Sequence, residues 1–165
     1  MGDTHTCKQP PLRVTRPSDA WQFVDLARVG RASGGTKFQL WYGAARANII
    51  INAWVEGLRD EIKKDPSGHA VEQRRRQLEG TVRELKVVRR KRVKIGKRVG
   101  ALLVVTGKVP ARRDPTRLRP ITIEKAICYR PEDSVFLEVH LEFEDPRRTK
   151  QLEKDFKKLL KKVRF

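Results

Sequence analysis

Four segments of the chain carry the apolar patterns of β-strands. Residues 36–43, TKFQLWYG, form a short aromatic run bounded by glycines. Residues 99–109 are mostly apolar, which favours a buried strand. Residues 121–130 and 135–143 flank the turn sequence PEDS, so we expect them to pair as the two arms of a hairpin. The pattern therefore predicts about four strands, most of them antiparallel.

Other segments carry apolar residues at three- and four-residue steps, the period of an amphipathic helix. Residues 44–64 show this period clearly, and the sequence DPSG at 65–68 is expected to end that helix. A second helix is predicted over about residues 69–90, with a thinner apolar stripe. These two helices would be the longest in the molecule.

A final helix is predicted over residues 146–165, because Asp145 and Pro146 suit the start of a helix. Its apolar stripe consists of Leu152, Phe156, Leu159, Leu160 and Val163. Such a stripe must be buried against another surface. It either covers the sheet or pairs with a second copy of the chain, so a homodimer formed through residues 146–165 is one expectation.

The N-terminal part is predicted to contribute little to the fold. Residues 1–17 hold three prolines and little apolar periodicity, which indicates a flexible arm. Ser18 and Asp19 can cap a short helix that carries Trp21. Residues 18–165 are then a single α+β domain, with about four mostly antiparallel strands and helices packed on one face.

The excess of positive charge indicates the class of partner, which the pattern of apolar residues does not. The 165 residues include 38 lysines and arginines against 20 acidic residues, a net charge of +18, and such an excess favours a polyanionic partner. No apolar run is long enough to span a membrane, and no secretory signal is legible. Two cysteines, Cys7 and Cys128, cannot form a disulfide framework, so we expect a reducing cytoplasmic location and no membrane partner.

The positive charges are clustered. Residues 89–98, RRKRVKIGKR, hold seven cations and no acid, and they run directly into the apolar strand predicted at 99–109. Residues 110–120, PARRDPTRLRP, form a basic loop at the other end of that strand. A cationic edge held by a rigid strand can follow a phosphate backbone. The candidate nucleic-acid-binding cations are Arg74, Arg75, Arg89, Arg90, Lys91, Arg92, Lys94, Lys97, Arg98, Arg112, Arg113, Arg117 and Arg119.

Two aromatic side chains are candidates for stacking on bases. Trp41 alternates with Phe38 and Tyr42, so it is expected on the outer face of its strand. Phe136 shares a face with Glu138 and other polar residues in the second hairpin arm. Binders of single strands combine a positive groove with such aromatic platforms.

Catalytic patterns are weak. Glu138, His140 and Glu142 share one strand face and could hold a metal, but polar residues alternate in this way on any solvated sheet face. No phosphate-binding loop, nucleophile elbow or zinc motif is present. We therefore expect no enzyme activity, no cofactor and no metal.

A second acidic pattern bears on a nuclease. Asp114 followed by Glu124 and Lys125 resembles the acid pattern of metal-dependent nucleases. Because Glu124 and Lys125 are adjacent on a strand, their side chains should point to opposite faces and cannot share one metal.

The layout resembles the ThermoDBP family of archaeal single-stranded nucleic-acid-binding proteins. The features that carry the resemblance are the strand TKFQLWYG, the basic stretch RRKRVKIGKR, the hairpin arms ITIEKAICYR and VFLEVHLEF, and the terminal helix. The resemblance implies a small basic α+β protein that binds single strands in a cleft with an apolar floor. It also implies possible self-association through the C-terminal helix.

The sequence therefore favours a non-enzymatic protein that binds single-stranded DNA or RNA through a basic track and aromatic stacking. A structural RNA-binding component of a ribonucleoprotein, such as the ribosome, is the first alternative. A metal-dependent nuclease and a packaging protein are the others.

Overall fold

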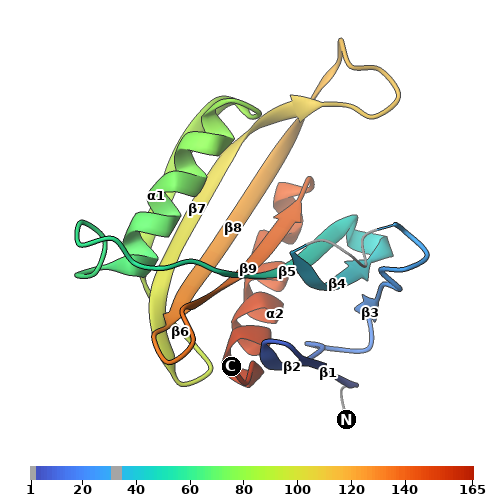
Figure 1. Ribbon diagram of the computed structural model, residues 1–165. Coiled ribbons are helices and arrows are strands. Elements are labelled where there is room, and N and C mark those ends of the chain that lie inside the picture. Colours follow the sequence, from blue (N-terminus) through green and yellow to red (C-terminus); the bar gives the residue numbers. More distant parts are fainter. Residues whose placement is uncertain (1–2, 31–34) are drawn as a thin grey trace.

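An antiparallel β-sheet organises the molecule, and the computed structural model describes residues 3–30 and 35–165. Seven strands follow the order β3-β4-β5-β9-β8-β7-β6, and β1 and β2 form a separate hairpin (Figure 1). The strands are β1 (Thr4–Lys8), β2 (Pro11–Thr15), β3 (Gln22–Phe23), β4 (Thr36–Tyr42), β5 (Ala47–Val55), β6 (Arg83–Ile95), β7 (Arg98–Pro110), β8 (Leu118–Arg130) and β9 (Val135–Phe143). The helices are α1 (Pro66–Glu79) and α2 (Thr149–Lys162), with short 3-10 turns at η1 (Gly43–Ala45) and η2 (Pro146–Arg148).

The two helices cover opposite faces of this sheet (Figure 1). Leu102 and Val104 of β7 are buried in the core that includes the apolar stripe of α2. Their neighbours Leu103 and Val105 are buried in a second core with Val71 of α1. Since successive side chains of a strand point to opposite faces, α1 and α2 must lie on opposite sides. The central strands are therefore buried on both faces.

The predicted fold class is wrong in strand number and in layering. The described residues form nine strands and are mostly β, whereas about four strands were expected. Helices lie on both faces of the sheet, whereas one face was expected. Burial on both faces lets a strand carry apolar residues at consecutive positions, which hides the two-residue period on which the prediction relied.

The largest error concerns residues 44–64, which were expected to be a helix. Residues 47–55 are instead the strand β5, paired with β4 on one side and β9 on the other. Ile49 and Ile51 are buried on the α2 side, while Ile50 and Trp54 lie on the opposite face. Apolar residues on both faces of a strand produce three- and four-residue steps that imitate a helix.

The second predicted helix is half right. Asp65 begins α1 rather than ending a helix, because its carboxylate accepts a hydrogen bond from the Gly68 amide at 3.0 Å. The helix ends at Glu79, and after Gly80 the chain enters β6. Most of the basic stretch at 89–98 therefore lies on β6 and on its turn into β7.

Residues 4–15, which lie within the segment expected to be a flexible arm, form paired strands. β1 and β2 form a hairpin, and the backbone of Arg13 exchanges two hydrogen bonds with Arg164 near the C-terminus. The short helix expected around Trp21 is replaced by turns and β3. The Trp21 indole is fully buried and donates a hydrogen bond to Asp155 of α2 at 3.0 Å. The hairpin and the hydrogen bonds of Arg13 join residues 4–15 to each other and to the C-terminal residues.

The remaining elements confirm their predictions. The strand at 36–43, the strand at 99–109, the hairpin at 121–143 and the C-terminal helix are all present. The apolar stripe of α2 is buried against the helix's own sheet. The homodimer through residues 146–165 stays a prediction, although the stripe that suggested it is already covered. No helix in the described residues is long and apolar enough to cross a membrane.

Candidate nucleic-acid interface

The basic stretch lies on the edge strand β6, where its cations are divided between two faces. Arg90 pairs with Leu103, whose side chain is on the α1 side, and Arg89 pairs with Val104, whose side chain is on the α2 side. Because successive side chains of a strand alternate between its two faces, Arg92 and Lys94 lie on the α1 side with Arg90. The same alternation assigns Lys91 to the α2 side with Arg89. The single cationic track expected from the sequence is therefore split in two.

On the α1 side, the cations border a groove of about 780 Å³. We call this the basic groove: it lies between the N-terminal turn of α1 and the end of the β6–β7 hairpin. Its apolar lining includes Val71, Ala101 and the half-buried Tyr129. Its cationic lining consists of Lys63, Lys64, Arg90, Lys91 and Arg92, which are all exposed.

An acidic residue of α1 holds one of these cations in place. Glu72 accepts hydrogen bonds from Arg90 and from Arg75, the latter at 2.7 Å. These bonds, first from Arg75 and then from Arg90, lower the pKa of the Glu72 carboxyl to about 2. Glu72 therefore stays ionised at neutral pH and keeps the Arg90 guanidinium beside α1.

Two predicted binding residues are occupied by internal contacts. Arg74 donates to the buried Glu138 at 2.8 Å, and its guanidinium lies 4.8 Å from the centre of the Trp54 ring. Arg75 forms ion pairs with Glu72 and Glu79. Both side chains are also largely covered, at 27% and 22% exposure, so they leave the set of candidate phosphate ligands. Arg90 stays in the set because its side chain is 49% exposed and contacts Glu72 through Nη2 alone.

The other predicted cations are spread over the molecule. The Arg89 Nη2 atom lies 3.6 Å from Glu153 Oε1 of α2. The Arg98 Nε atom donates to the Phe165 carbonyl oxygen at 3.1 Å. Arg119 pairs with Glu144. The exposed members that lie away from the basic groove are Lys94, Lys97, Arg112, Arg113 and Arg117.

Phe136 is not a stacking platform for bases. Its side chain is only 2% exposed, because it is packed between the rings of Trp54 and Tyr129 under α1. The ring centroids lie 5.3 Å from Trp54 and 4.7 Å from Tyr129. The polar neighbours of Phe136 suggested a solvated face, but α1 and the side chains around it cover that position.

Trp41 is exposed but lies far from the basic stretch. The indole is 37% exposed at the end of β4. Strand β4 is five strand spacings from β6, which corresponds to about 24 Å across the sheet. Trp41 and the arginines of β6 therefore cannot form one compact binding site.

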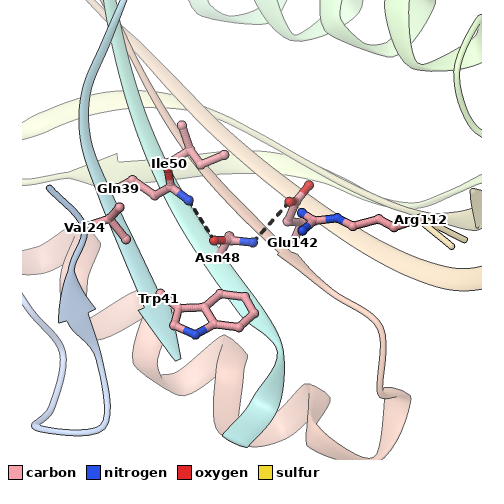
Figure 2. Close-up of a pocket in the computed structure, with 7 residues that line it drawn as sticks. All are labelled: Val24, Gln39, Trp41, Asn48, Ile50, Arg112 and Glu142. Atoms are coloured by element: carbon pink, nitrogen blue, oxygen red, sulfur yellow. Dashed lines mark hydrogen bonds between the residues drawn. The ribbon is translucent and has the colours of Figure 1, made fainter. Parts of the chain in front are cut away.

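Trp41 instead borders its own concavity, which we call the Trp41 pocket (Figure 2). Its volume is about 240 Å³. The lining residues are Val24, Gln39, Trp41, Asn48, Ile50, Arg112 and Glu142. Arg112 reaches the pocket from the loop between β7 and β8, so the pocket brings together two of the candidate binding residues, Trp41 and Arg112.

The acidic residues considered for metal binding do not converge. Glu138 is buried against Lys125, and the His140 Nε2 atom lies 3.1 Å from Glu142. Glu124 and Lys125 face opposite sides of β8, as expected, and Asp114 bonds to Thr116 in the distant loop. In the described parts of the chain, no group of three or more His, Cys, Asp or Glu side chains could hold a metal.

Sequence reasoning missed three lining residues of the basic groove. Lys63 and Lys64 were placed near the end of a helix that does not exist, and Tyr129 was placed in a hairpin arm without a role. The position of the two lysines directly before the helix-capping Asp65 was the available signal. Nothing local indicates that the end of β8 lies beside that helix.

Comparison with known proteins identifies the fold alone. No family model and no curated protein matches this chain. The Ran-binding protein Mog1p of Saccharomyces cerevisiae is similar in structure, with a TM-score of 0.63 and 10% identity over 99% of this chain and 95% of that one. The PsbP protein CyanoP of Synechocystis has a TM-score of 0.62 and 11% identity over 98% of this chain and 91% of that one.

A Bacteroides thetaiotaomicron protein is similar over 99% of this chain, with a TM-score of 0.57 and 12% identity. This chain spans 48% of that protein's length. At such low identities the likeness concerns the arrangement of strands and helices. The resemblance to the ThermoDBP family stays a prediction.

Proposed function

We propose that the protein binds single-stranded nucleic acid in the basic groove, without catalysing a reaction. The observation that carries the proposal is the lining of that groove: exposed cations border an apolar floor that includes an aromatic ring. Phosphates would contact Arg90, Arg92, Lys63 and Lys64, and an unpaired base would contact Tyr129. Aromatic side chains stack on every base, whereas the bases of a duplex are already stacked on each other.

The edge position of β6 offers a competing explanation for part of the charge. Exposed edge strands often carry cations that prevent pairing with other sheets. That explanation does not extend to Lys63 and Lys64, which lie in the segment before α1 and face the same groove. Two separate segments thus place positive charge around one concavity.

Neutralising the groove is expected to weaken binding and its dependence on salt. The Arg90→Gln/Arg92→Gln variant should lower the affinity for an oligothymidine strand. It should also flatten the slope of log affinity against log salt by up to about 1.4, since each single-strand phosphate contact contributes about 0.7. Fluorescence anisotropy over a salt series measures both. The matched control is Lys158→Gln/Lys162→Gln on the exposed face of α2, and equal slopes in the two variants would refute the groove as the site.

The stacking part has its own expected result. Tyr129→Leu keeps an apolar side chain against Phe136 but removes the aromatic ring. A lost base stack costs roughly 1 to 3 kcal/mol, so single-strand affinity should fall about fivefold or more while the salt slope is unchanged. A folded variant that binds like the parent would remove Tyr129 from the site.

The choice between DNA and RNA is left to the same titrations. DNA and RNA strands of equal length bind alike if the groove reads only phosphate and one base face. A strong preference for RNA would favour the ribonucleoprotein component. The proposal includes a cytoplasmic location, supported by Cys7 and Cys128, which are both free thiols.

A further inference from the structure

The Trp41 pocket is separate from the basic groove and carries different chemistry. We propose that it binds a guanine base that bears a phosphate, with Trp41 stacking on the ring, Glu142 accepting from the base edge and Arg112 contacting the phosphate. The ligand is either a free guanine nucleotide or a guanine residue within a strand. This site does not depend on the basic groove, so either proposal can fail alone.

Strand register places the lining residues in one row. Trp41 of β4 is the cross-strand partner of Asn48 on β5, and Asn48 is the partner of Glu142 on β9. The row lies on the same face of the sheet as α1, beyond the strands that α1 covers. An indole, an amide and a carboxylate on adjacent strands thus line a shallow, continuous surface (Figure 2).

A chain of hydrogen bonds fixes the carboxylate in this row. Gln39 Nε2 donates to Asn48 Oδ1 at 3.0 Å, and Asn48 Nδ2 donates to Glu142 Oε1 at 3.5 Å (Figure 2). His140 Nε2 lies 3.1 Å from Glu142 Oε2. The hydrogen bond from His140 lowers the pKa of the Glu142 carboxyl despite its burial, so the group is an anionic acceptor at neutral pH.

The remaining capacity of this carboxylate matches a guanine edge. An ionised carboxylate has about four acceptor sites, and contacts with Asn48 and His140 use one on each oxygen. One site remains on each oxygen, and the Glu142 side chain is 32% exposed. Among the common bases, guanine presents two adjacent N–H donors, N1–H and N2–H, on its Watson–Crick edge. Adenine and cytosine each offer a single amino group beside an acceptor.

Arg112 supplies the charge for a phosphate. It projects from the β7–β8 loop to the rim of the pocket (Figure 2), and no hydrogen bond or ion pair among the described residues engages its side chain. An aromatic ring beside a carboxylate would also suit an organic cation. The guanidinium at the rim and the net charge of +18 oppose a cationic ligand and favour one that carries a phosphate.

The test is calorimetric titration with GMP, AMP, CMP and UMP. A good two-point contact to a base is worth about 1 to 3 kcal/mol of discrimination, so GMP should bind roughly five- to 150-fold more tightly than the other three. Equal binding of all four, or tighter binding of arginine than of GMP, would overturn the proposal. Titration with an all-thymine strand and with the same strand carrying one central guanine distinguishes a free nucleotide from a residue in a strand.

Three variants assign the roles. Glu142→Gln should abolish the preference for GMP, because an amide offers only one acceptor oxygen. Arg112→Gln lies on an exposed loop, so it keeps the fold, and it should remove the advantage of GMP over guanosine. Arg113→Gln on the same loop is the control and should bind like the parent. If Glu142→Gln loses its fold by circular dichroism, an unchanged ratio of GMP to guanosine affinity in Arg112→Gln still refutes the site.

The outcomes separate this site from the basic groove. An all-thymine strand requires only the basic groove, and GMP requires only the Trp41 pocket. Loss of GMP binding in Glu142→Gln with intact oligothymidine binding supports the pocket. GMP binding that responds to Arg90→Gln/Arg92→Gln but not to Arg112→Gln would assign the nucleotide to the groove and overturn the inference.

Discussion

The Glu138→Ala variant is expected to lose about 3 to 5 kcal/mol of its free energy of unfolding. The Glu138 side chain is only 2% exposed and accepts hydrogen bonds from Arg74 at 2.8 Å and from Asn52 at 2.9 Å. It also accepts from Lys125 at 3.4 Å. Removing the carboxylate leaves the nearly buried ammonium of Lys125 without its partner, and an unpaired buried charge is costly.

Urea unfolding at pH 7 measures this loss. The control is Glu132→Ala, whose side chain is 65% exposed and lies 3.4 Å from Arg98. Exposed pairs contribute about 0 to 1 kcal/mol, so that variant should unfold almost like the parent. Replacing both Glu138 by leucine and Lys125 by methionine should recover part of the stability, because the buried ammonium is then removed together with its partner. Arg74 loses the same carboxylate, but it is 27% exposed and keeps its hydrogen bond to Gln77. Equal midpoints for Glu138→Ala and the parent would contradict the account.

The contribution of Glu138 should depend on pH. Burial raises the pKa of its carboxyl, but Lys125 and Arg74 outweigh burial and hold it below its ordinary value. A carboxyl whose pKa is lower in the folded state stabilises the protein above its unfolded-state pKa. That stability is lost as the pH falls through the folded-state pKa. The difference between parent and Glu138→Ala should therefore shrink in acid.

The Glu124→Gln variant is expected to stabilise the protein at pH 8 by about 3 kcal/mol, and to change it little at pH 4.5. Burial, followed by repulsion from Glu153, raises the pKa of the Glu124 carboxyl from 4.5 to about 7. Its side chain is 3% exposed, and its Oε2 atom has no hydrogen-bond partner. The folded state therefore favours the protonated form, although Arg89, Lys157 and Lys91 attenuate the effect.

The sign of the Glu124 effect is opposite to that of Glu138. A carboxyl whose pKa is raised on folding contributes its full stability below the unfolded-state pKa. That stability is lost as the pH rises through about 7. Glutamine stays neutral, so the variant escapes the loss. Unfolding at pH 4.5 and 8 tests this, with the exposed Glu84→Gln as control; an equal gain at both pH values would refute the assignment.

Local sequence was sufficient where an element buries a single face. The stripe of α2 has a helical period because the other side of that helix is exposed. The hairpin of β8 and β9 was predictable although both strands are buried on both faces, because a turn sequence separates two runs rich in β-branched and aromatic residues. Local sequence misled where both faces are buried, as in β5, because the apolar period is then lost. It also misled at β6, where the thin stripe of α1 seemed to continue past Gly80.

For the candidate sites, too, some features follow from the sequence alone and others depend on the tertiary structure. Sequence alone determined the excess of positive charge, its concentration at 89–98 and in the β7–β8 loop, and the outward position of Trp41. Tertiary structure alone decided that Arg74 is engaged, because Glu138 comes from β9 and only folding brings it near. The partners of Arg75, Glu72 and Glu79, lie one helical turn away in the sequence. Tertiary structure also decided that β6 is an edge, that Lys63 and Lys64 border the same groove as β6, and that Trp41 lies near the opposite edge of the sheet. The physical reason is that strand order depends on pairings between residues far apart in the chain, and no local pattern of side chains records which strand will be its neighbour.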